Sequence, residues 1–258
     1  MNWFPQVGAG SVAQFPLSRS RRWRAIVNRM ESNEVILLPD TAAGQIGWKL
    51  SYQDLTDAEV QKLSGLFTAS QGAFGAFTFI DPLANLLGWS ENVSQSAWQL
   101  GLLQASTNVA DPLGTQRASS LTNPGQGTQS LRQSLGVSGE YVACFSAYLR
   151  SGVAGSVALQ RDGTAHIVTV GPSWRRFFIN GTGIAGASQS TFSVALSAGQ
   201  TIDVWGLQVE AQPYPSLYKH TSAPLGIHEE TYFADDELAV TSTGVGFSSC
   251  EITLISRV

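Results

Sequence analysis

Charged residues are scarce in this sequence. Asp, Glu, Lys and Arg make up 13% of the 258 residues, whereas roughly a quarter is usual in soluble domains. Neutral polar residues must therefore cover most of the surface, which suits contacts with other proteins and with sugars. The formal net charge of −4 argues against general nucleic-acid binding, because that requires a basic field that attracts phosphates.

The sequence also lacks any apolar run near the roughly 20 residues that cross a bilayer, so we expect no membrane insertion. The stretch MNWFPQVGAG lacks the charged and then apolar pattern of a secretory signal, and we expect synthesis in a cytoplasm. The two cysteines, Cys144 and Cys250, both lie in alternating apolar segments. A reduced thiol behaves there as a small hydrophobic group, so we expect no disulfide.

Sequence motifs of catalysis and metal binding are missing as well. No serine lies in a nucleophile elbow, the three histidines fall in unrelated contexts, and no acidic cluster has the spacing of a calcium-binding loop. A glycosidase would need two carboxylates across a sugar, and the sequence does not show that any two of Asp162, Asp203 and Glu210 approach each other. We expect no enzyme, no metal site and no cofactor.

The first eighty residues or so predict a meander of strands and one helix. The segments RRWRAIVNRM, VILLPD and QIGWKLSY predict three strands joined by turns, and FGAFTFIDP predicts a fourth that ends at Asp81 and Pro82. Between them, Thr56 and Glu59 form a capping box at the start of a helix. Its apolar face would consist of Val60, Leu63, Leu66 and Phe67.

The middle of the chain predicts an antiparallel β-sandwich of jelly-roll type. Short alternating runs are separated there by clusters of Gly, Ser, Asn and Pro, with no further helix. The candidate strands are SLRQSLGV, EYVACFSAYLR, GSVALQRD, AHIVTV, WRRFFIN, STFSVAL and TIDVWGLQVE.

The last stretch of the chain resembles the first eighty residues in its sequence pattern, because it has charged turns and strand-like runs around Leu238 and Ile252. We therefore expect a mainly β protein with a discontinuous host domain, residues 1–83 and 223–258, that is sandwich-like and carries the helix. Residues 84–222 would form an inserted β-sandwich, because insertions are tolerated where the two ends lie close together.

The middle region resembles the carbohydrate-binding-like jelly-roll module found in many phage and prophage tail proteins. The resemblance rests on an opening signature, NLLGWSENVSQSAWQ, and a closing signature, VWGLQVEAQPYPSLYKHT, and covers residues 85–221.

The first region resembles the belt domain of phage distal tail and baseplate-hub proteins, through Tyr52, the helix from Thr56 and the strand that ends at Pro82. Proteins of this kind form a ring that joins the tail tube to the hub and host-binding parts. The resemblance implies a self-associating protein, a hexamer or alternatively a trimer, whose partners are tail tube, hub and fibre proteins. It also implies a location in the virion tail.

The basic cluster on the first predicted strand is the strongest charge feature. Functionally, such a strand can form bidentate bonds to carboxylates of a neighbouring subunit or tube protein, and we favour this interface. The alternatives are a solvated strand edge that discourages sheet pairing and, third, nucleic-acid contact. The cluster consists of Arg19, Arg21, Arg22, Arg24 and Arg29. The carboxylates could come from an acidic group on an adjacent subunit, which consists of Glu229, Glu230, Asp235, Asp236 and Glu237. The alternative is that this group is simply a solvated face.

Aromatic residues supply the candidate sugar contacts, because aromatic rings stack on sugar faces while polar neighbours hold the hydroxyls. We select Trp89, Trp98 and Trp174 as candidate glycan contacts. Trp98 could instead pack one end of the sandwich, and Trp205 is expected in the core. Tyr214 and Tyr218 lie in a proline-rich stretch that is expected to fasten the module to the host domain.

The sequence thus predicts a structural component of a phage-type tail tip that carries an outward-facing accessory sandwich. The alternative, from another class, is a receptor-binding module that recognises a host surface polysaccharide. A binder would expose aromatic rings in a groove and bind a glycan, whereas a scaffold would bury apolar interfaces between subunits.

Overall fold

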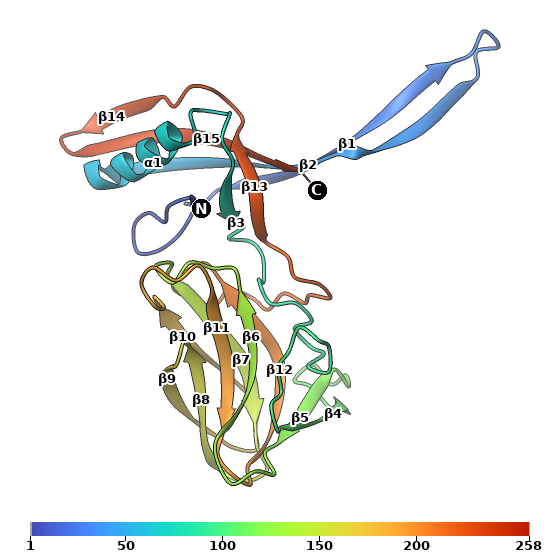
Figure 1. Cartoon of the computed structure of the whole chain (residues 1–258), viewed down its shortest axis with the longest axis vertical. Coiled ribbons are helices and arrows are strands. Elements are labelled where there is room, and N and C mark those ends of the chain that lie inside the picture. Colours follow the sequence, from blue (N-terminus) through green and yellow to red (C-terminus); the bar gives the residue numbers. More distant parts are fainter. Residues whose placement is uncertain (1, 258) are drawn as a thin grey trace. The chain divides into compact units, whose positions relative to one another are not determined.

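The computed structural model describes residues 2–257, which form fifteen strands and one helix (Figure 1). The predicted fold class, mainly β with an antiparallel sandwich and a single helix, is confirmed. The described chain divides into two compact units. Unit 1 contains residues 2–8, 12–80 and 228–257, and unit 2 contains residues 9–11 and 81–227.

Unit 1 is built on a six-stranded sheet with the order β1-β2-β15-β13-β3, in which β14 also pairs with β15. Its long central strands are antiparallel, since β2 pairs with β1 on one side and with β15 on the other. The strands are β1 (Ser18–Arg29), β2 (Val35–Thr56), β3 (Phe77–Ile80), β13 (Ile227–Phe233), β14 (Val240–Gly244) and β15 (Phe247–Arg257).

The core of unit 1 lies between this sheet and helix α1 (Asp57–Ala69). The helix buries Leu63 and Leu66, and Val60 and Phe67 pack against the same cluster, so the predicted apolar face is confirmed. At its N-terminus, the Glu59 carboxylate accepts hydrogen bonds from the Thr56 N–H (2.8 Å) and hydroxyl (2.7 Å). The capping box therefore fixes where the helix begins.

Strand β2 departs from the sequence prediction, because one continuous strand of 22 residues replaces two short strands and a turn. The pairing with β1 shifts register between Arg22 and Arg24, where the strand partner moves from Gln45 to Asp40. This irregularity in the pairing sets residues 41–44 of β2 against a single residue of β1, so the strand continues where the sequence predicted a turn.

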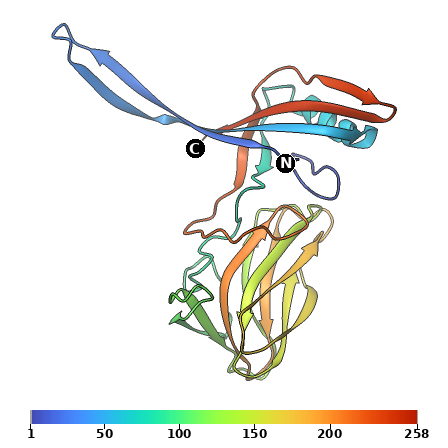
Figure 2. The same cartoon turned by 180° about the vertical axis from the view of Figure 1, so that it is seen from behind.

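Beyond this register shift, β1 and β2 form a two-stranded ribbon, residues 23–40, which we call the arm (Figures 1 and 2). Residues 23–39 are all exposed. Both faces of the ribbon carry large apolar side chains, because strand residues alternate between faces. The exposed apolar residues of the arm are Trp23, Ile26, Val27, Met30, Val35, Ile36, Leu37 and Leu38.

Unit 2 is a sandwich of a five-stranded sheet, β10-β7-β12-β5-β4, and a four-stranded sheet, β6-β11-β8-β9 (Figure 2). The pairs recorded within both sheets are antiparallel. The strands are β4 (Gln104–Val109), β5 (Ala118–Thr122), β6 (Gln129–Leu135), β7 (Ala143–Arg150), β8 (Gly155–Arg161), β9 (Thr164–Val170), β10 (Arg175–Gly181), β11 (Ser190–Leu196) and β12 (Thr201–Glu210).

Arg161, on β8, carries a charge into the interior of unit 2, where its side chain is 4% exposed. Its guanidinium donates to the carbonyls of Tyr141 (2.7 Å), Ser138 (3.2 Å) and Gly181. Asp162 lies 3.6 Å away as counter-charge. A buried charge is tolerated only when it is paired and hydrogen-bonded, so Arg161 ties two loops to the edge of the sandwich.

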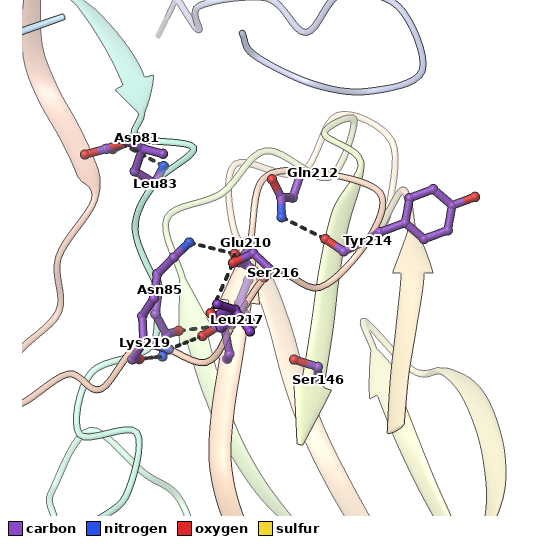
Figure 3. A network of polar contacts seen from close by, with 12 residues as sticks. Asp81, Leu83, Asn85, Ser146, Glu210, Gln212, Tyr214, Ser216, Leu217 and Lys219 are labelled. Carbon is purple, nitrogen blue, oxygen red and sulfur yellow. Dashed lines mark hydrogen bonds and ion pairs between the residues drawn. The ribbon is translucent and has the colours of Figure 1, made fainter. Parts of the chain in front are cut away.

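The segment that follows β12, residues 211–221, lies across the outer face of the five-stranded sheet, and we call it the closing segment (Figure 3). Glu210, with a fully buried side chain, accepts from the Ser216 N–H (2.9 Å) and pairs with Lys219 (2.9 Å). The Tyr218 ring lies 4.6 Å from that of Trp205. Trp205 is buried under this segment, and Tyr218 fastens the segment to unit 2 itself, contrary to the expectation that it ties the module to the host domain.

The closing segment also holds the opening segment of unit 2, residues 85–90. The Asn85 side-chain amide donates to the carbonyls of Leu207 and Lys219, both at 3.0 Å (Figure 3). The Thr221 hydroxyl donates to the Leu87 carbonyl at 2.6 Å. Unit 2 therefore begins and ends with two segments that are hydrogen-bonded to each other.

Candidate functional site: a polar pocket in unit 2

A polar pocket of about 390 Å³ lies within unit 2. Its wall comes from residues 89, 91–92, 107–108, 116–118 and 220–222. The first and last of these stretches meet because the Ser90 hydroxyl accepts from the Thr221 N–H at 2.9 Å, although the two residues are 131 positions apart. The pocket thus depends on the same contacts that join the two ends of unit 2.

Trp89 is half-buried in the wall and has a left-handed backbone conformation, with φ of 55°. A residue with a side chain rarely adopts this conformation, because its Cβ crowds the backbone. Its carbonyl oxygen accepts hydrogen bonds from the indole Nε1 of Trp98 (3.1 Å) and from the N–H of Asn92 (3.0 Å). These bonds hold the turn that carries Trp89 at the pocket.

Glu91 supplies the carboxylate of the pocket, and its side chain is 7% exposed. Its Oε2 lies 3.4 Å from Arg117 Nη1 and 3.7 Å from His220 Nε2. Its Oε1 is buried without a hydrogen-bond partner among the described residues. A buried carboxylate oxygen without a donor is unusual and marks a position where a donor is missing.

Arg117 is held in place by Asp111, whose side chain is fully buried. The Asp111 carboxylate accepts from the Arg117 N–H (3.2 Å) and lies 3.7 Å from its Nε, which donates to the Thr115 hydroxyl (2.9 Å). Burial acts to raise the pKa of Asp111, but hydrogen bonds from the Thr115 hydroxyl and three N–H groups outweigh it, so the pKa lies below its usual value. Asp111 is therefore a permanent negative partner of Arg117.

Tyr218 stays a neutral hydroxyl beside this site. Burial raises its pKa far above the usual range, and the hydrogen bond with Ser90 opposes this change. The charge of Glu91 and a hydrogen-bonding interaction with its carboxylate act in the same direction as burial. The phenol therefore serves as a neutral link in the network that holds the pocket wall.

The pocket gathers an aromatic ring, a carboxylate, a guanidinium and an imidazole, together with the amides of Asn92, Asn108 and Gln116. Its volume is within the range of about 300–1,000 Å³ that small-ligand sites occupy. Such a set can bind a small polar ligand by stacking and by hydrogen bonds in both directions.

The three candidate tryptophans are not brought together by the fold. Trp89 lines the pocket, and Trp98 is 5% exposed, so its ring presents no face to a ligand and its role is to support Trp89. Trp174 does not line this pocket, and its ring lies under the Arg150 guanidinium at 4.7 Å. Arg150 is itself paired with Asp203 at 2.8 Å.

Sequence reasoning missed most of the pocket. Glu91 belongs to the opening signature of the middle region, but nothing in that signature indicates a binding role for a carboxylate. Arg117 and Asn108 have no local signal, apart from the positive φ of Asn108, 62°, which a sequence does not reveal. His220 is one of the three histidines whose sequence contexts show no binding pattern, but it lines the pocket with a half-exposed side chain.

The arginine cluster lies on exposed positions of β1 in unit 1. Arg24 pairs with Asp40 on the neighbouring strand, with Nε 2.8 Å from the carboxylate. For Arg19, Arg21, Arg22 and Arg29, the contact with another subunit stays a prediction. The acidic group is exposed, and within it Asp236 accepts a hydrogen bond from the Ala73 N–H at 2.9 Å.

Residues 2–257 contain neither a cluster of metal ligands nor a helix that could cross a membrane. Within that range no three His, Cys, Asp or Glu side chains are grouped so that they could hold a metal ion. Within the same range no helix has the length and apolar character to cross a membrane.

No protein-family model matches this sequence, and no curated protein matches it. Among solved structures, the chain is similar to the enzymatically active domain of tailspike protein 4 from Bacteriophage CBA120. The identity is 14%, the TM-score is 0.37, and the match covers 52% of this chain and 22% of the tailspike chain.

The chain is also similar to the C-terminal family 22 carbohydrate-binding module of Clostridium thermocellum Xyn10B, with 15% identity, a TM-score of 0.41 and coverage of 53% of this chain and 100% of the module. It is similar as well to the CBM22-1 xylan-binding domain of Paenibacillus barcinonensis Xyn10C, with 11% identity and a TM-score of 0.38. That match covers 54% of this chain and 95% of the domain.

Proposed function

We propose that this chain is an attachment protein whose unit 2 binds a surface saccharide in the pocket beside Trp89. The observation that carries the proposal is the pocket itself, in which an indole, a carboxylate without a full set of donors and a guanidinium line one space. Sugars need this combination, because their ring faces are apolar and their edges carry hydroxyls. The sequence resemblance of residues 85–221 to carbohydrate-binding-like tail modules supports the same function.

We further propose that the chain binds its saccharide without cleaving it. Glu91 is the one carboxylate among the described residues that line the pocket, whereas glycoside hydrolysis uses two across the scissile bond. Its contacts with Arg117 and His220 support a binding role. Incubation with a bound polysaccharide should therefore release no reducing ends, and a measured release would overturn this part of the proposal.

Binding is tested with the full chain on arrays of bacterial surface polysaccharides, followed by affinity measurements on each hit. Trp89→Ala should weaken binding by about fivefold or more, because stacking on a ring contributes roughly 1 kcal/mol or more. Trp174→Ala is the matched control and should leave affinity unchanged, since Trp174 does not line the pocket. Equal losses in the two variants, or no binding to any polysaccharide, would contradict the proposal.

A second candidate function is the ring-forming component of a phage-type tail tip, and the arm favours it. The arm exposes eight large apolar side chains over residues 23–38. Apolar surface of this kind on an exposed ribbon marks a protein contact or an aggregation hazard. Identical contacts between neighbouring copies would close into a ring by rotation. The proposed partners are then tail tube, hub and fibre proteins, and the proposed location is the virion tail.

Light scattering of the purified chain over a concentration series tests this second function. A discrete hexamer or trimer is the expected result, and Ile26→Ser combined with Leu37→Ser should shift it toward the monomer. Val153→Ser, also at an exposed apolar position but in unit 2, is the control. A chain that stays monomeric at all concentrations, with or without purified tail tube, would contradict the ring.

A further inference from the structure

We infer that the pocket is specific for an uncharged sugar residue with two adjacent free hydroxyls, which Glu91 and Arg117 grip together while the sugar ring lies against Trp89. This inference rests on the proposed saccharide-binding function and adds the chemical class of the ligand. It follows from the hydrogen-bonding capacity that the pocket leaves unused and from the balance of its charges.

Glu91 requires a donor from the ligand. An ionised carboxylate only accepts hydrogen bonds, and within the described chain its Oε1 accepts none of ordinary geometry, although the neighbouring Tyr218 phenol interacts with this carboxylate. Arg117 and His220 both approach the other oxygen, Oε2. A small rotation of the carboxyl group toward the pocket would let a ligand hydroxyl donate to it, and that hydroxyl would then satisfy the group.

Arg117 supplies the complementary donor. Its guanidinium carries five N–H bonds, and its contacts with Thr115 and Glu91 use Nε and Nη1. In the described chain this leaves Nη2, on a side chain that is 46% exposed. Neighbouring hydroxyls of a sugar can donate with one oxygen and accept with the next, so an adjacent carboxylate and guanidinium match such a pair.

The charges of the site disfavour an acidic sugar. Arg117 already lies between two carboxylates, Glu91 at 3.4 Å and the buried Asp111 at 3.7 Å. With His220 neutral, these three groups sum to one negative charge. A uronate or sialate carboxylate would have to compete with Glu91 for the same guanidinium and would lie beside a like charge. An uncharged sugar avoids this repulsion.

The remaining wall supports a hydroxyl-rich ligand. Asn108 and Gln116 line the pocket from the end of β4 and from the residues before β5. Side-chain amides donate and accept, so they suit the further hydroxyls of the same ring. An indole, a carboxylate, a guanidinium and two amides thus surround one ligand-sized space.

The test measures the affinity of the full chain for single sugars by calorimetry or ligand-observed NMR. The probes are methyl mannoside, methyl galactoside and methyl glucoside, and the comparison set contains methyl glucuronide and N-acetylneuraminate. At least one neutral glycoside should bind, and each acidic sugar should bind at least tenfold more weakly than that glycoside. Tighter binding of an acidic sugar would overturn the inference.

Two changes, one in the protein and one in the ligand, test the contact of Glu91 and Arg117 with the hydroxyl pair. Glu91→Gln should cost tenfold or more in affinity for the neutral glycoside, whereas Glu140→Gln, at an exposed position outside the pocket, should cost nothing. Monodeoxy glycosides that lack one hydroxyl of the pair should bind the unmodified protein more weakly. This measurement does not depend on whether a variant folds. An unchanged affinity in both experiments would overturn the inference.

The same set of measurements separates this inference from the function on which it rests. If polysaccharide binding is lost in Trp89→Ala but kept in Glu91→Gln, the saccharide function stands and the Glu91 and Arg117 grip is wrong. If neither polysaccharide nor single sugar binds the unmodified chain, both are wrong.

Discussion

Burial decides what the thiols of this protein can do. Cys144 and Cys250 are both buried as free thiols. Burial raises the pKa of Cys144 to about 12, with the charge of Glu210 adding to the rise and that of Arg176 opposing it. Burial also raises the pKa of Cys250. Because the thiolate is the reactive form, both cysteines are expected to be inert in the folded chain.

We predict that neither cysteine reacts with a thiol reagent at pH 8 until the protein is unfolded. At a pKa of about 12, roughly one Cys144 in ten thousand is ionised at this pH. Mass spectrometry after timed alkylation measures the result. Val245→Cys, at a fully exposed position, is the positive control and should react at once. Rapid modification of either native cysteine in the folded protein would show that its surroundings open far more readily than the structure implies.

The pocket was only partly predictable from individual residues. Trp89 was selected because aromatic rings are the general tools of sugar binding, and it lines the site. Glu91, Arg117 and His220 were not selected, because a carboxylate, a cation and a histidine that are far apart in sequence have no pattern that reports their meeting. Their proximity is a product of the fold, through contacts such as that between Ser90 and Thr221.

At the scale of single elements, helix α1 depends on the charge of Glu59. The hydrogen bond from the Thr56 hydroxyl is the largest cause of the lowered pKa of Glu59, and burial opposes it. Hydrogen bonds from the backbone N–H groups of Thr56 and Gly8 and the charge of Lys62 lower the pKa further. A carboxyl group with a lowered pKa in the folded state stabilises that state above the pKa of the unfolded chain. The contribution disappears as the pH falls through the folded-state pKa.

We predict that Glu59→Ala lowers the free energy of unfolding of unit 1 by about 1 kcal/mol at pH 7. The difference from the unmodified protein should shrink as the pH falls below 4.5, the reference value for this carboxyl group. Hydrogen exchange of α1 amides in a urea series measures it. Asp57→Ala, in the same first turn, controls for the helix dipole. A difference that stays constant down to pH 3.5 would contradict the role of the charge.

Strand β8 gives a second prediction, on the buried Arg161. Arg161→Leu should destabilise unit 2 by about 3–5 kcal/mol, because it leaves the buried Asp162 and the carbonyls of Ser138 and Tyr141 without their partner. Thermal unfolding of the variant measures the loss. Arg132→Leu, which removes an exposed arginine from β6, should change stability by less than about 1 kcal/mol. Similar losses in the two variants would argue against a special role for the buried charge.

The success of element prediction followed the strength of apolar alternation. All seven predicted strands of the sandwich are present, as β6 to β12. The two missed strands of the sandwich carry little of that signal: β4 is exposed along most of its length, with the sequence QASTNV, and β5 reads ASSLT. In unit 1, β13 was missed as well, and the run predicted around Leu238 is wrong, because Leu238 lies before β14. Strand β2 was divided in two because Asp40 and the residues after it resemble a turn, whereas the register shift opposite Arg22 and Arg24 lets the strand continue.

At the scale of the whole molecule, the described chain forms two compact units, and the second lies within the sequence of the first. The sequence placed the boundaries after residues 83 and 222. The structure places them after residues 80 and 227, so the Asp81-Pro82 pair and residues 223–227 belong to unit 2. A change in residue composition and in the length of apolar runs locates such a boundary only to within a few residues, because turn residues occur on both sides of it.

We predict that residues 81–227, expressed alone, fold and unfold cooperatively. Their core is their own, and their opening and closing segments hydrogen-bond to each other. The matched control is residues 91–216, which keeps the sandwich strands but removes both segments, and it should lose the sharp transition. Calorimetry and amide NMR spectra measure the outcome. A disordered 81–227 fragment would mean that unit 2 needs the rest of the chain to fold.

The hydrogen bond between the Asp81 N–H and the Gly226 carbonyl, at 2.8 Å, joins the two ends of the stretch 81–227 of unit 2, from its first residue to its last but one. On either side of it, β3 ends at Ile80 and β13 begins at Ile227, and these two strands are neighbours in the sheet of unit 1. The intervening domain therefore replaces what would otherwise be a hairpin turn, and loop-closure entropy grows only slowly with loop length. An ancestral gene could therefore have acquired this domain by insertion, and another lineage could exchange it for a different domain. Neither event would change the strand order of the unit 1 sheet.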